Sequence, residues 1–333
     1  MKVATILGTR PQYIKFKPLY DYFKKIGCDS IVADTNQHYT KNISSVFVEE
    51  FGFDIDFNLK ITDTDFGRDF FSFAIDQVVQ FLMNCRPDIV VVIGDTNSTL
   101  IAALAAKRCG IKIAHIEAGI RCGSVSRPEE VNRVVVDELS DIHFTARKED
   151  DKNVKNPIYV GDLELFMLNE MDRSNKISTR RFDDFLLMTI HRRENATPDR
   201  IKDILKYCEE YGSPLIFPIH HTTKRIIEEN SISIPKNIQV TEPKNYIEIL
   251  ELMSSCKGIF TDSGGIIKTS PFFGKKCLVP LEVTEYDDLV KLGYSEMGTD
   301  FSLFNSPEVE VNKTMYYVEN TCEIIFNFLK NTI

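Results

Sequence analysis

Residues 89–99 read IVVVIGDTNST, a run of apolar residues that ends abruptly in a glycine, an aspartate and several hydroxyl side chains. A short run that is apolar throughout predicts a strand buried on both faces, as in parallel sheets covered by helices. The hydroxyl residues that follow are typical of the first turn of a helix. This strand–turn–helix signature predicts an α/β fold.

The same alternation extends in both directions along the chain. The expected strands are residues 2–7, 29–33, 89–93, 111–116 and 141–145, followed by 185–190, 214–218, 237–240, 257–261 and 276–279. The expected helices between them include residues 11–26, 66–84, 97–108, 198–211 and 245–254. Strands that alternate with helices form parallel sheets. Because the series runs twice, we expect two Rossmann-like, doubly wound domains that face each other across a ligand-binding cleft.

The length of the chain supports this division, because 333 residues exceed one ordinary core and suit two domains of about 150 residues. A charged break at residues 171–176 marks the expected boundary. We therefore expect an N-terminal domain over residues 1–172 and a C-terminal domain over residues 173–314. Residues 315–333 are expected to form a helix that packs back on the N-terminal domain.

Composition excludes several classes of function. The net charge of −9 argues against a nucleic-acid or anionic-membrane partner, since few cations are available to neutralise phosphates. Neither a signal peptide nor a run of about 20 apolar residues is present. The eight cysteines are scattered and contain no Cys-x-x-Cys pair. These features predict a cytoplasmic protein without disulfides or structural zinc.

Two glycine-containing turns are candidates for binding a phosphate. Residues 8–15, GTRPQYIK, follow the first strand, and Arg10 and Lys15 would add charge to the positive end of a helix dipole. Residues 261–265, TDSGG, follow another strand, and their consecutive glycines expose backbone N–H groups to an anion. Either turn is equally well an ordinary strand-to-helix connection, and the first lacks the spacing of a dinucleotide-binding motif.

Three acidic residues are expected near one edge of the first sheet. Asp95 and Glu117 directly follow strands 89–93 and 111–116, and Glu129 lies at the start of a helix. A helix cap would by itself explain Asp95. Three carboxylates at one edge exceed what caps require, and such a group can separate pKa values into one proton acceptor and one donor. The pattern therefore favours an acid/base site.

Histidines mark the strand ends of the second domain. His191 follows strand 185–190, and His220 and His221 follow strand 214–218. A histidine at such a position is more often a structural residue than an acid or a base. His220 and His221 lack a third ligand at a recognisable spacing, so we expect no bound metal.

Taken together, these segments resemble the non-hydrolysing UDP-N-acetylglucosamine 2-epimerases, whose two-domain architecture is the one that glycosyltransferases call GT-B. The motifs that carry the resemblance are GTRP (8–11), IK (14–15), QH (37–38), GDT (94–96), HxEAGxR (115–121), PEExNR (128–133), HRRE (191–194) and TDSGGI (261–266). Each motif is weak alone. In this order and spacing, from about residue 2 to about residue 300, they are specific.

The resemblance implies a reversible, cofactor-free epimerisation at C2 of UDP-N-acetylglucosamine or a related UDP sugar. UDP is eliminated to give 2-acetamidoglucal and then added back. The implied acid/base residues are Asp95, Glu117 and Glu129, with His191 near the diphosphate. The implied substrate- and nucleotide-binding residues are Arg10, Lys15, Arg133, Arg192, His220, Ser263, Gly264 and Gly265. Gln37 and His38 match a segment that lines an activating second site in bacterial members, and the expected assembly is a homodimer.

Several positions depart from the family pattern. Gln12 stands where a glutamate is usual, and Tyr286 stands where an arginine is usual. Ile267, Lys268 and Thr269 replace Gln-Glu-Glu, so Thr269 takes the place of the carboxylate that grips the ribose. We therefore expect the ligand to be held more by diphosphate charge, with Lys268 as an exposed cation, and less by the ribose hydroxyls. Another nucleotide or a related UDP sugar is an open alternative.

Three other functions compete with this interpretation. A hydrolysing 2-epimerase and a retaining GT-B glycosyltransferase share the architecture, but a transferase would leave the three acidic positions unexplained. A non-catalytic nucleotide-sugar binding paralogue would fit the altered residues 267–269. Such a sensor would not need Asp95, Glu117 and Glu129, because it transfers no proton.

Overall fold

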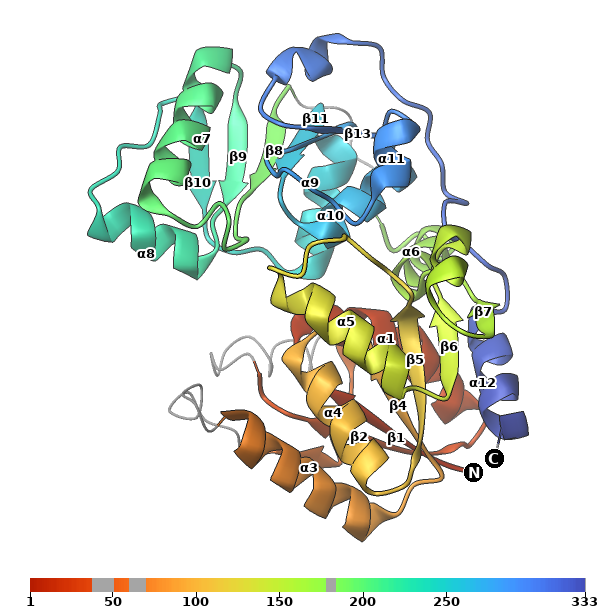
Figure 1. The fold of residues 1–333 in the computed structure, drawn as a ribbon. Coiled ribbons are helices and arrows are strands. Elements are labelled where there is room, and N and C mark those ends of the chain that lie inside the picture. The colour runs from red at the N-terminus through yellow and green to blue at the C-terminus, as the bar shows by residue number, and fades with distance from the viewer. Residues whose placement is uncertain (38–50, 60–69, 178–183, 333) are drawn as a thin grey trace. The chain divides into compact units, whose positions relative to one another are not determined.

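The computed structural model describes residues 1–37, 51–59, 70–177 and 184–332. They form two compact units (Figure 1). The first unit comprises Met1–Leu168 together with Tyr316–Ile333, and the second comprises Asn169–Met315. Each unit is built on a parallel sheet of its own, so the predicted α/β class with two parallel-sheet domains is confirmed.

The first sheet has the strand order β3-β2-β1-β4-β5-β6-β7, with every neighbouring pair parallel. Its strands are β1 (Lys2–Leu7), β2 (Asp29–Asp34), β3 (Phe57–Asn58), β4 (Ile89–Ile93), β5 (Lys112–Ala118), β6 (Ile142–Thr145) and β7 (Pro157–Tyr159). The order reverses between β1 and β4. In doubly wound sheets, ligands bind at the carboxyl ends of the strands that flank such a reversal.

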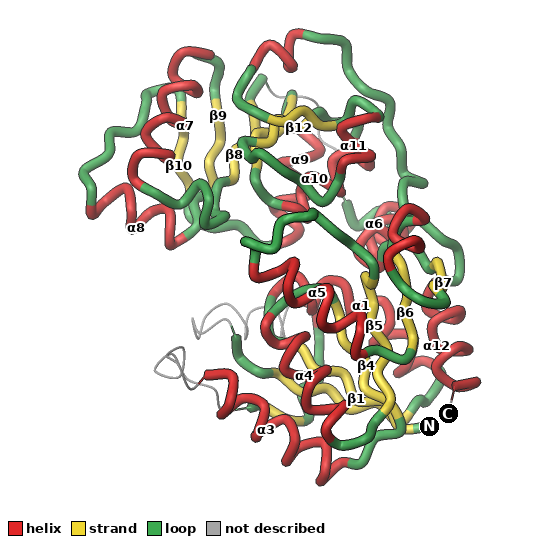
Figure 2. The backbone as a smooth tube through the Cα atoms, viewed as in Figure 1, coloured by secondary structure: helices red, strands yellow, loops and turns green. Residues whose placement is uncertain are grey.

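Helices cover both faces of this sheet (Figure 2). They are α1 (Arg10–Lys25), α3 (Phe70–Cys85), α4 (Asn97–Arg108), α5 (Pro128–Leu139), α6 (Leu163–Arg173), which continues into the second unit, and α12 (Thr321–Thr332). One core cluster contains residues of α1 and α12, and the other contains residues of α3, α4 and α5. Both faces of the strands are therefore buried, which is why β4 is apolar throughout.

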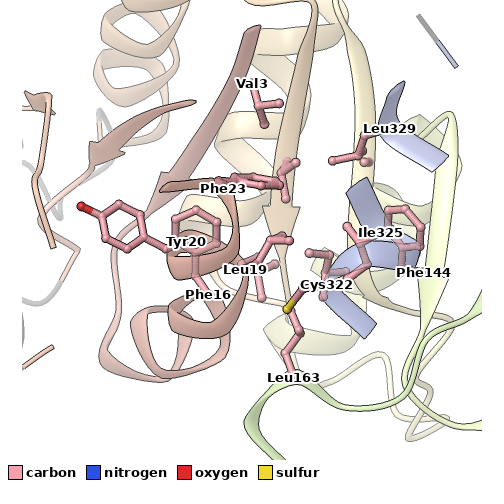
Figure 3. Packing of buried hydrophobic residues seen from close by; sticks show 14 of the residues in the cluster. Val3, Phe16, Leu19, Tyr20, Phe23, Phe144, Leu163, Cys322, Ile325 and Leu329 are labelled. Carbon is pink, nitrogen blue, oxygen red and sulfur yellow. The ribbon is translucent and has the colours of Figure 1, made fainter. Parts of the chain in front are cut away.

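The C-terminal helix α12 belongs to the first core although it is distant in sequence. Cys322, Ile325 and Leu329 of α12 are buried in the same cluster as Phe23 and Phe144 (Figure 3). These apolar residues recur at the spacing of one helix face. The chain thus returns to the first unit after completing the second.

The second sheet has the strand order β10-β9-β8-β11-β12-β13, again entirely parallel. Its strands are β8 (Leu186–Thr189), β9 (Leu215–Pro218), β10 (Ile238–Thr241), β11 (Gly258–Thr261), β12 (Cys277–Val279) and β13 (Ser295–Met297). Its helices are α7 (Pro198–Tyr211), α8 (His221–Glu229), α9 (Tyr246–Ser255), α10 (Gly264–Thr269) and α11 (Asp287–Lys291). The order reverses between β8 and β11, so this unit repeats the topology of the first.

All ten expected strands are present, each within two residues of its predicted bounds. The strands β3, β7 and β13 were not predicted, because two or three residues show no periodicity. The tail helix begins at Thr321 rather than at residue 315, since Tyr316 and Asn320 adopt left-handed backbone conformations that a right-handed helix cannot contain. The expected domain boundary was residue 172, and the compact units divide after Leu168.

Candidate active site

The buried side chain of Gln12 links the turn after β1 to the end of β4 by hydrogen bonds. The Gln12 side-chain oxygen accepts hydrogen bonds from the backbone N–H groups of Gly8 (2.9 Å) and Thr9 (3.1 Å). Its amide nitrogen donates to the Ile93 carbonyl (3.0 Å) and to Thr99 Oγ1 (3.0 Å). An ionised glutamate could accept the first pair but has no proton for the second pair. The amide at this position therefore joins the two strand ends that flank the reversal of the sheet.

Glu117 lies in an unusual backbone conformation at the end of β5. Its φ is +68°, which is rare for a residue with a side chain. The pairing of β5 with β6 shifts here, from Ile116 opposite Phe144 to Ala118 opposite Thr145, so Glu117 is the extra residue of a β-bulge. Bulges next to active sites re-aim a side chain.

The Glu117 carboxylate is paired with a cation from α1. Lys15 Nζ lies 2.5 Å from Glu117 Oε2, and only 7% of the Glu117 side chain is exposed. Gly94, at the end of the neighbouring strand, packs against this pair, since a Cβ there would lie 3.3 Å from Glu117 Oε2. The next residue is Asp95. The structure thus brings Lys15, Glu117 and the Asp95 turn together.

Asp95 is held by the start of α5. Arg133 donates to Asp95 Oδ2 at 2.5 Å, and the Asn132 side chain donates to the Asp95 carbonyl at 2.8 Å. Arg133 also contacts the Glu130 carboxylate at 3.1 Å. The Asp95 side chain nevertheless keeps 29% of its surface exposed. The predicted ligand-binding residue Arg133 is therefore the partner of a carboxylate in this structure.

Glu129 and Glu130 have different environments in the first turn of α5. Glu129 is exposed, and its side chain makes no hydrogen bond or ion pair with the residues that the structure describes. Glu130 is buried and accepts hydrogen bonds from the backbone N–H groups of Cys122 (2.9 Å) and Gly123 (3.0 Å). Burial alone would raise the pKa of Glu130, but these hydrogen bonds outweigh it and lower that pKa. Glu130 therefore fixes the loop that precedes α5.

The remaining predicted residues of the first unit lie near the same strand ends. Arg10 begins α1 and is partly exposed. The Gln37 side-chain oxygen accepts hydrogen bonds from the backbone N–H (2.9 Å) and the hydroxyl (2.6 Å) of Ser98, and so caps the start of α4. His38 lies outside the described residues.

In the second unit, one buried carboxylate organises the turn after β8. Asp262 directly follows β11, and its side chain is fully buried. It accepts hydrogen bonds from the backbone N–H groups of His191 and Arg192, both at 3.0 Å, and from the Asn195 side chain at 3.0 Å. His191 Nδ1 lies 3.0 Å from Asp262 Oδ1. Burial would raise the pKa of Asp262, but the contacts with His191 and Asn195 lower it.

Arg192 lies against the glycine turn that begins α10. Its guanidinium donates to Glu285 Oε1 at 3.1 Å. A Cβ on Gly264 would lie 3.3 Å from the Arg192 guanidinium and 3.4 Å from the Tyr286 ring. Ser263 is the N-cap residue of α10, and Gly265 is exposed with open space beside it. The predicted residues 192, 263, 264 and 265 are thus neighbours.

His220 lies close to His191. It is the N-cap residue of α8, and its ring centroid is 5.9 Å from that of His191. In residues 1–37, 51–59, 70–177 and 184–332, no three His, Cys, Asp or Glu side chains gather into a metal site. Within the same part of the chain, no helix is long and apolar enough to cross a membrane.

Comparison with known proteins identifies the family. Residues 24–300 match the family model described as UDP-N-acetylglucosamine 2-epimerase. The chain belongs to the UDP-N-acetylglucosamine 2-epimerase family. Epimerases are isomerases, and this assigns the enzyme class.

Relatives of this family extend along almost the whole chain. The UDP-N-acetylglucosamine 2-epimerase of Methanocaldococcus jannaschii is 32% identical over 341 residues, which cover 94% of this chain and 93% of that protein. The UDP-2,3-diacetamido-2,3-dideoxy-D-glucuronate 2-epimerase of Pseudomonas aeruginosa is 33% identical over 310 residues, with coverages of 88% and 87%.

The solved structures of the family share the fold. The crystal structure of the M. jannaschii epimerase in complex with UDP-GlcNAc and UDP superposes with a TM-score of 0.84 at 28% identity, covering 99% of this chain and all of that one. The Neisseria meningitidis epimerase bound to UDP-GlcNAc gives 0.83 at 26% identity, with the same coverages. The predicted GT-B class is confirmed.

One expectation about the epimerase motif TDSGGI and the residues after it is wrong. Lys268 was expected to offer an exposed cation, but only 1% of its surface is exposed. Thr269 is also buried, and its hydroxyl donates to the Gly265 carbonyl at 2.6 Å within α10. Ile267 is buried as well, so the C-terminal half of α10 is enclosed on more than one face. Salt-sensitive binding through Lys268 is therefore not expected.

Sequence reasoning also missed several residues of this family member's candidate site. Gln12, His115, Asp137 and Asp262 are buried and hydrogen-bonded to the strand ends that carry the predicted residues. Asp262 could have been found, because it directly follows a strand as Asp95 does. Gln12, His115 and Asp137 lie inside a helix or a strand. Their positions in the sequence do not indicate which residues they hydrogen-bond with after folding.

Proposed function

We propose that this chain reversibly epimerises C2 of a nucleotide-activated N-acetylhexosamine, the pair UDP-GlcNAc and UDP-ManNAc or a related UDP sugar. A carboxylate takes the proton from C2, the C2–H electron pair forms a C1–C2 double bond, and the C1–O bond to UDP breaks. The resulting 2-acetamidoglucal receives a proton on the other face of C2, and UDP adds back to C1. No net oxidation occurs.

The observation that carries this proposal is the backbone conformation of Glu117 and its position beside Lys15 and Asp95. A non-glycine residue in a left-handed conformation costs about 1–3 kcal/mol and persists only where its surroundings hold it there. Here the strained residue is a carboxylate at a strand end, 2.5 Å from Lys15 and beside the Gly94-Asp95 turn. We assign Glu117 and Asp95 as the proton-transfer pair, with Lys15 and Arg133 as the cations paired with them. Glu129 remains the third acid/base residue that the family resemblance implies.

We assign binding of the diphosphate to the second unit. Arg192 has its guanidinium oriented by Glu285, and it borders Gly264 at the turn of the TDSGGI motif. His191 is oriented by Asp262 and keeps 40% of its side chain exposed. Oriented donors of this kind stabilise the charge that develops on a leaving group. The relative from M. jannaschii, crystallised with UDP-GlcNAc and UDP, supports the choice of nucleotide.

Turnover in deuterated water tests the reaction. With UDP-GlcNAc as substrate, we expect UDP-ManNAc to form and both epimers to carry deuterium at C2, measured by proton NMR and mass spectrometry. Turnover without label would refute proton abstraction at C2. Release of free sugar would indicate the hydrolysing reaction, and binding without turnover would indicate a non-catalytic paralogue. UDP-2,3-diacetamido-2,3-dideoxy-D-glucuronate, named for the P. aeruginosa relative, is the second substrate to test.

A further inference from the structure

A buried histidine–aspartate pair lies behind the strand ends that carry Asp95 and Glu117. His115, in β5, has no exposed surface, and Asp137, in α5, is also buried. Asp137 Oδ1 lies 2.7 Å from His115 Nδ1. Neither side chain has a role in the reaction proposed above.

Asp137 spans the bulge that contains Glu117. Its Oδ1 contacts the ring of His115, two residues before Glu117, and its Oδ2 accepts the backbone N–H of Gly119 at 3.1 Å, two residues after Glu117. A single carboxylate therefore holds both ends of the five-residue segment 115–119. Arg121 also contacts Asp137 Oδ2, at 2.7 Å, and adds a counter-charge.

The other nitrogen of His115 reaches the neighbouring strand. His115 Nε2 lies 2.9 Å from the carbonyl oxygen of Gly94, the residue before Asp95. A carbonyl can only accept, so Nε2 carries a proton. His115 Nδ1 contacts Asp137 Oδ1, and the other oxygen of Asp137 accepts from Gly119. The ring thus ties the Asp95 turn to the Glu117 bulge.

The backbone on both sides of this pair needs such restraint. Glu117 has a φ of +68°, a strained conformation that persists only where the surroundings over-determine it. Gly94 and Gly119 have φ values of +68° and +81°, which glycine adopts readily and other residues do not. Gly119 is confined further, since a Cβ there would lie 2.5 Å from the Asp150 carbonyl oxygen. The Asn153 side chain also donates to the Gly119 carbonyl at 2.8 Å.

We propose that His115 and Asp137 are positioning residues that aim Glu117 and Asp95 at the substrate. The inference rests on the proposed function of those two carboxylates. It differs from a general contribution to stability, because the pair contacts the backbone on both sides of Glu117 and directly before Asp95. Misplacement by about 1 Å can cost 100-fold in rate.

A double-mutant cycle between His115→Gln and Glu117→Gln tests this proposal. We expect His115→Gln to lower kcat by about 10- to 100-fold while KM changes by less than about 3-fold, because the diphosphate-binding groups are untouched. We expect the double variant to be no slower than Glu117→Gln alone, since residues that act as one unit are not additive.

His143→Gln is the matched control. His143 is the register partner of His115 on β6, is also buried, and its Nε2 contacts the Asp137 carbonyl at 2.8 Å. Among the described residues, its side chain makes no hydrogen bond to Gly94 or Gly119. We expect this control to keep kcat within about 2-fold of wild type. Equal losses in the two histidine variants, or losses that multiply in the double variant, would overturn the positioning role.

Two further results keep the test decisive. If Glu117→Gln keeps full activity, the proposed role of Glu117 in proton transfer is refuted, and this result is distinct from a failure of the positioning role. If His115→Gln does not fold, nitrogen NMR of the wild-type histidines decides instead. We expect one buried ring whose Nε2-bound proton exchanges slowly and is shifted by Asp137→Asn. A His115 ring with no proton on Nε2 would overturn the proposal.

Discussion

The two units place an aspartate at the same topological position and use it differently. Asp95 follows β4 and Asp262 follows β11, and each of these strands lies next to the point where the order of its sheet reverses. Asp262 is fully buried, whereas the Asp95 side chain is 29% exposed. Asp262 accepts hydrogen bonds from the backbone of the adjacent turn, whereas Asp95 is paired with an arginine side chain.

This difference shows that a carboxylate at the end of a parallel strand is not by itself a reactive group. The Asp262 carboxylate accepts from amide groups that are fixed in the turn. Protonating this carboxylate would weaken several of these hydrogen bonds at once. Asp95 can exchange its partner for a substrate without breaking the turn. The number of fixed donors, rather than the position in the fold, separates the structural aspartate from the proposed acid/base residue.

The largest expected effect is on the proton-transfer pair. Asp95→Asn and Glu117→Gln should each lower kcat by about 10²- to 10⁴-fold, the usual contribution of a general acid or base. UDP affinity should stay within about 3-fold, because the proposed diphosphate-binding groups lie in the other unit. Steady-state kinetics and calorimetric titration with UDP measure the two quantities.

Glu138→Gln is the control for these variants. Glu138 is an exposed carboxylate of α5 that makes no hydrogen bond or ion pair with the described residues. We expect it to behave as wild type. Full activity of both Asp95→Asn and Glu117→Gln would mean that these side chains are structural, like Asp262.

Asp262→Asn should have the opposite profile. An asparagine keeps the volume but turns an amino group toward backbone donors, so the turn that carries His191 and Arg192 should loosen. We expect UDP affinity to fall by about 10-fold, equivalent to about 1.4 kcal/mol, with kcat at saturation reduced less. A collapse of kcat at unchanged UDP affinity would erase the distinction between Asp262 and Asp95.

The contrast also shows what sequence could predict. The buried strands were predicted because their apolar runs are long and uniform, and Asp95 and Glu117 were predicted because they directly follow such runs. The parallel sheets and the reversal of their order follow from that alternation. Strand β7, with three residues at a sheet edge, gave no comparable signal.

The supporting residues could not be predicted, because their partners are distant in sequence. Gln12 lies 81 residues from Ile93, and His115 lies 22 residues from Asp137. The role of each of these residues depends on which atoms face each other after folding. Lys268 was mispredicted for a related reason, since its place after the glycine turn is visible in the sequence but the burial of the C-terminal half of α10 is not.

A smaller effect is expected from the arginine of the second unit. Arg192→Lys should weaken UDP binding by about 5-fold, because lysine is a point charge and cannot contact Glu285 and a phosphate through one planar fork. Arg193→Lys is the matched control, since Arg193 is the exposed neighbour and its side chain makes no hydrogen bond or ion pair within the described part of the chain. Equal titration curves for the two variants would exclude Arg192 from the nucleotide site.

The smallest expected effect is the acid dependence of stability. Contacts that outweigh burial lower the pKa of Asp262 in the second unit and of Asp137 in the first. A carboxyl group whose pKa is lowered by folding binds fewer protons in the folded than in the unfolded state, so its stabilisation is present above its ordinary pKa of about 3.9 and is lost as the pH falls through the folded value. The unfolding temperature of the wild-type protein should therefore be constant between about pH 5 and 7 and decline below about pH 4.

Asp262→Asn removes one such group. We expect the unfolding temperature of this variant to be lower than that of wild type at pH 7 but to decline less steeply in acid, by a difference of about 2–4 °C. Calorimetric scans from neutral to acid pH measure this slope. Parallel declines in variant and wild type would mean that Asp262 keeps an ordinary pKa and that its hydrogen bonds are weaker than their geometry indicates.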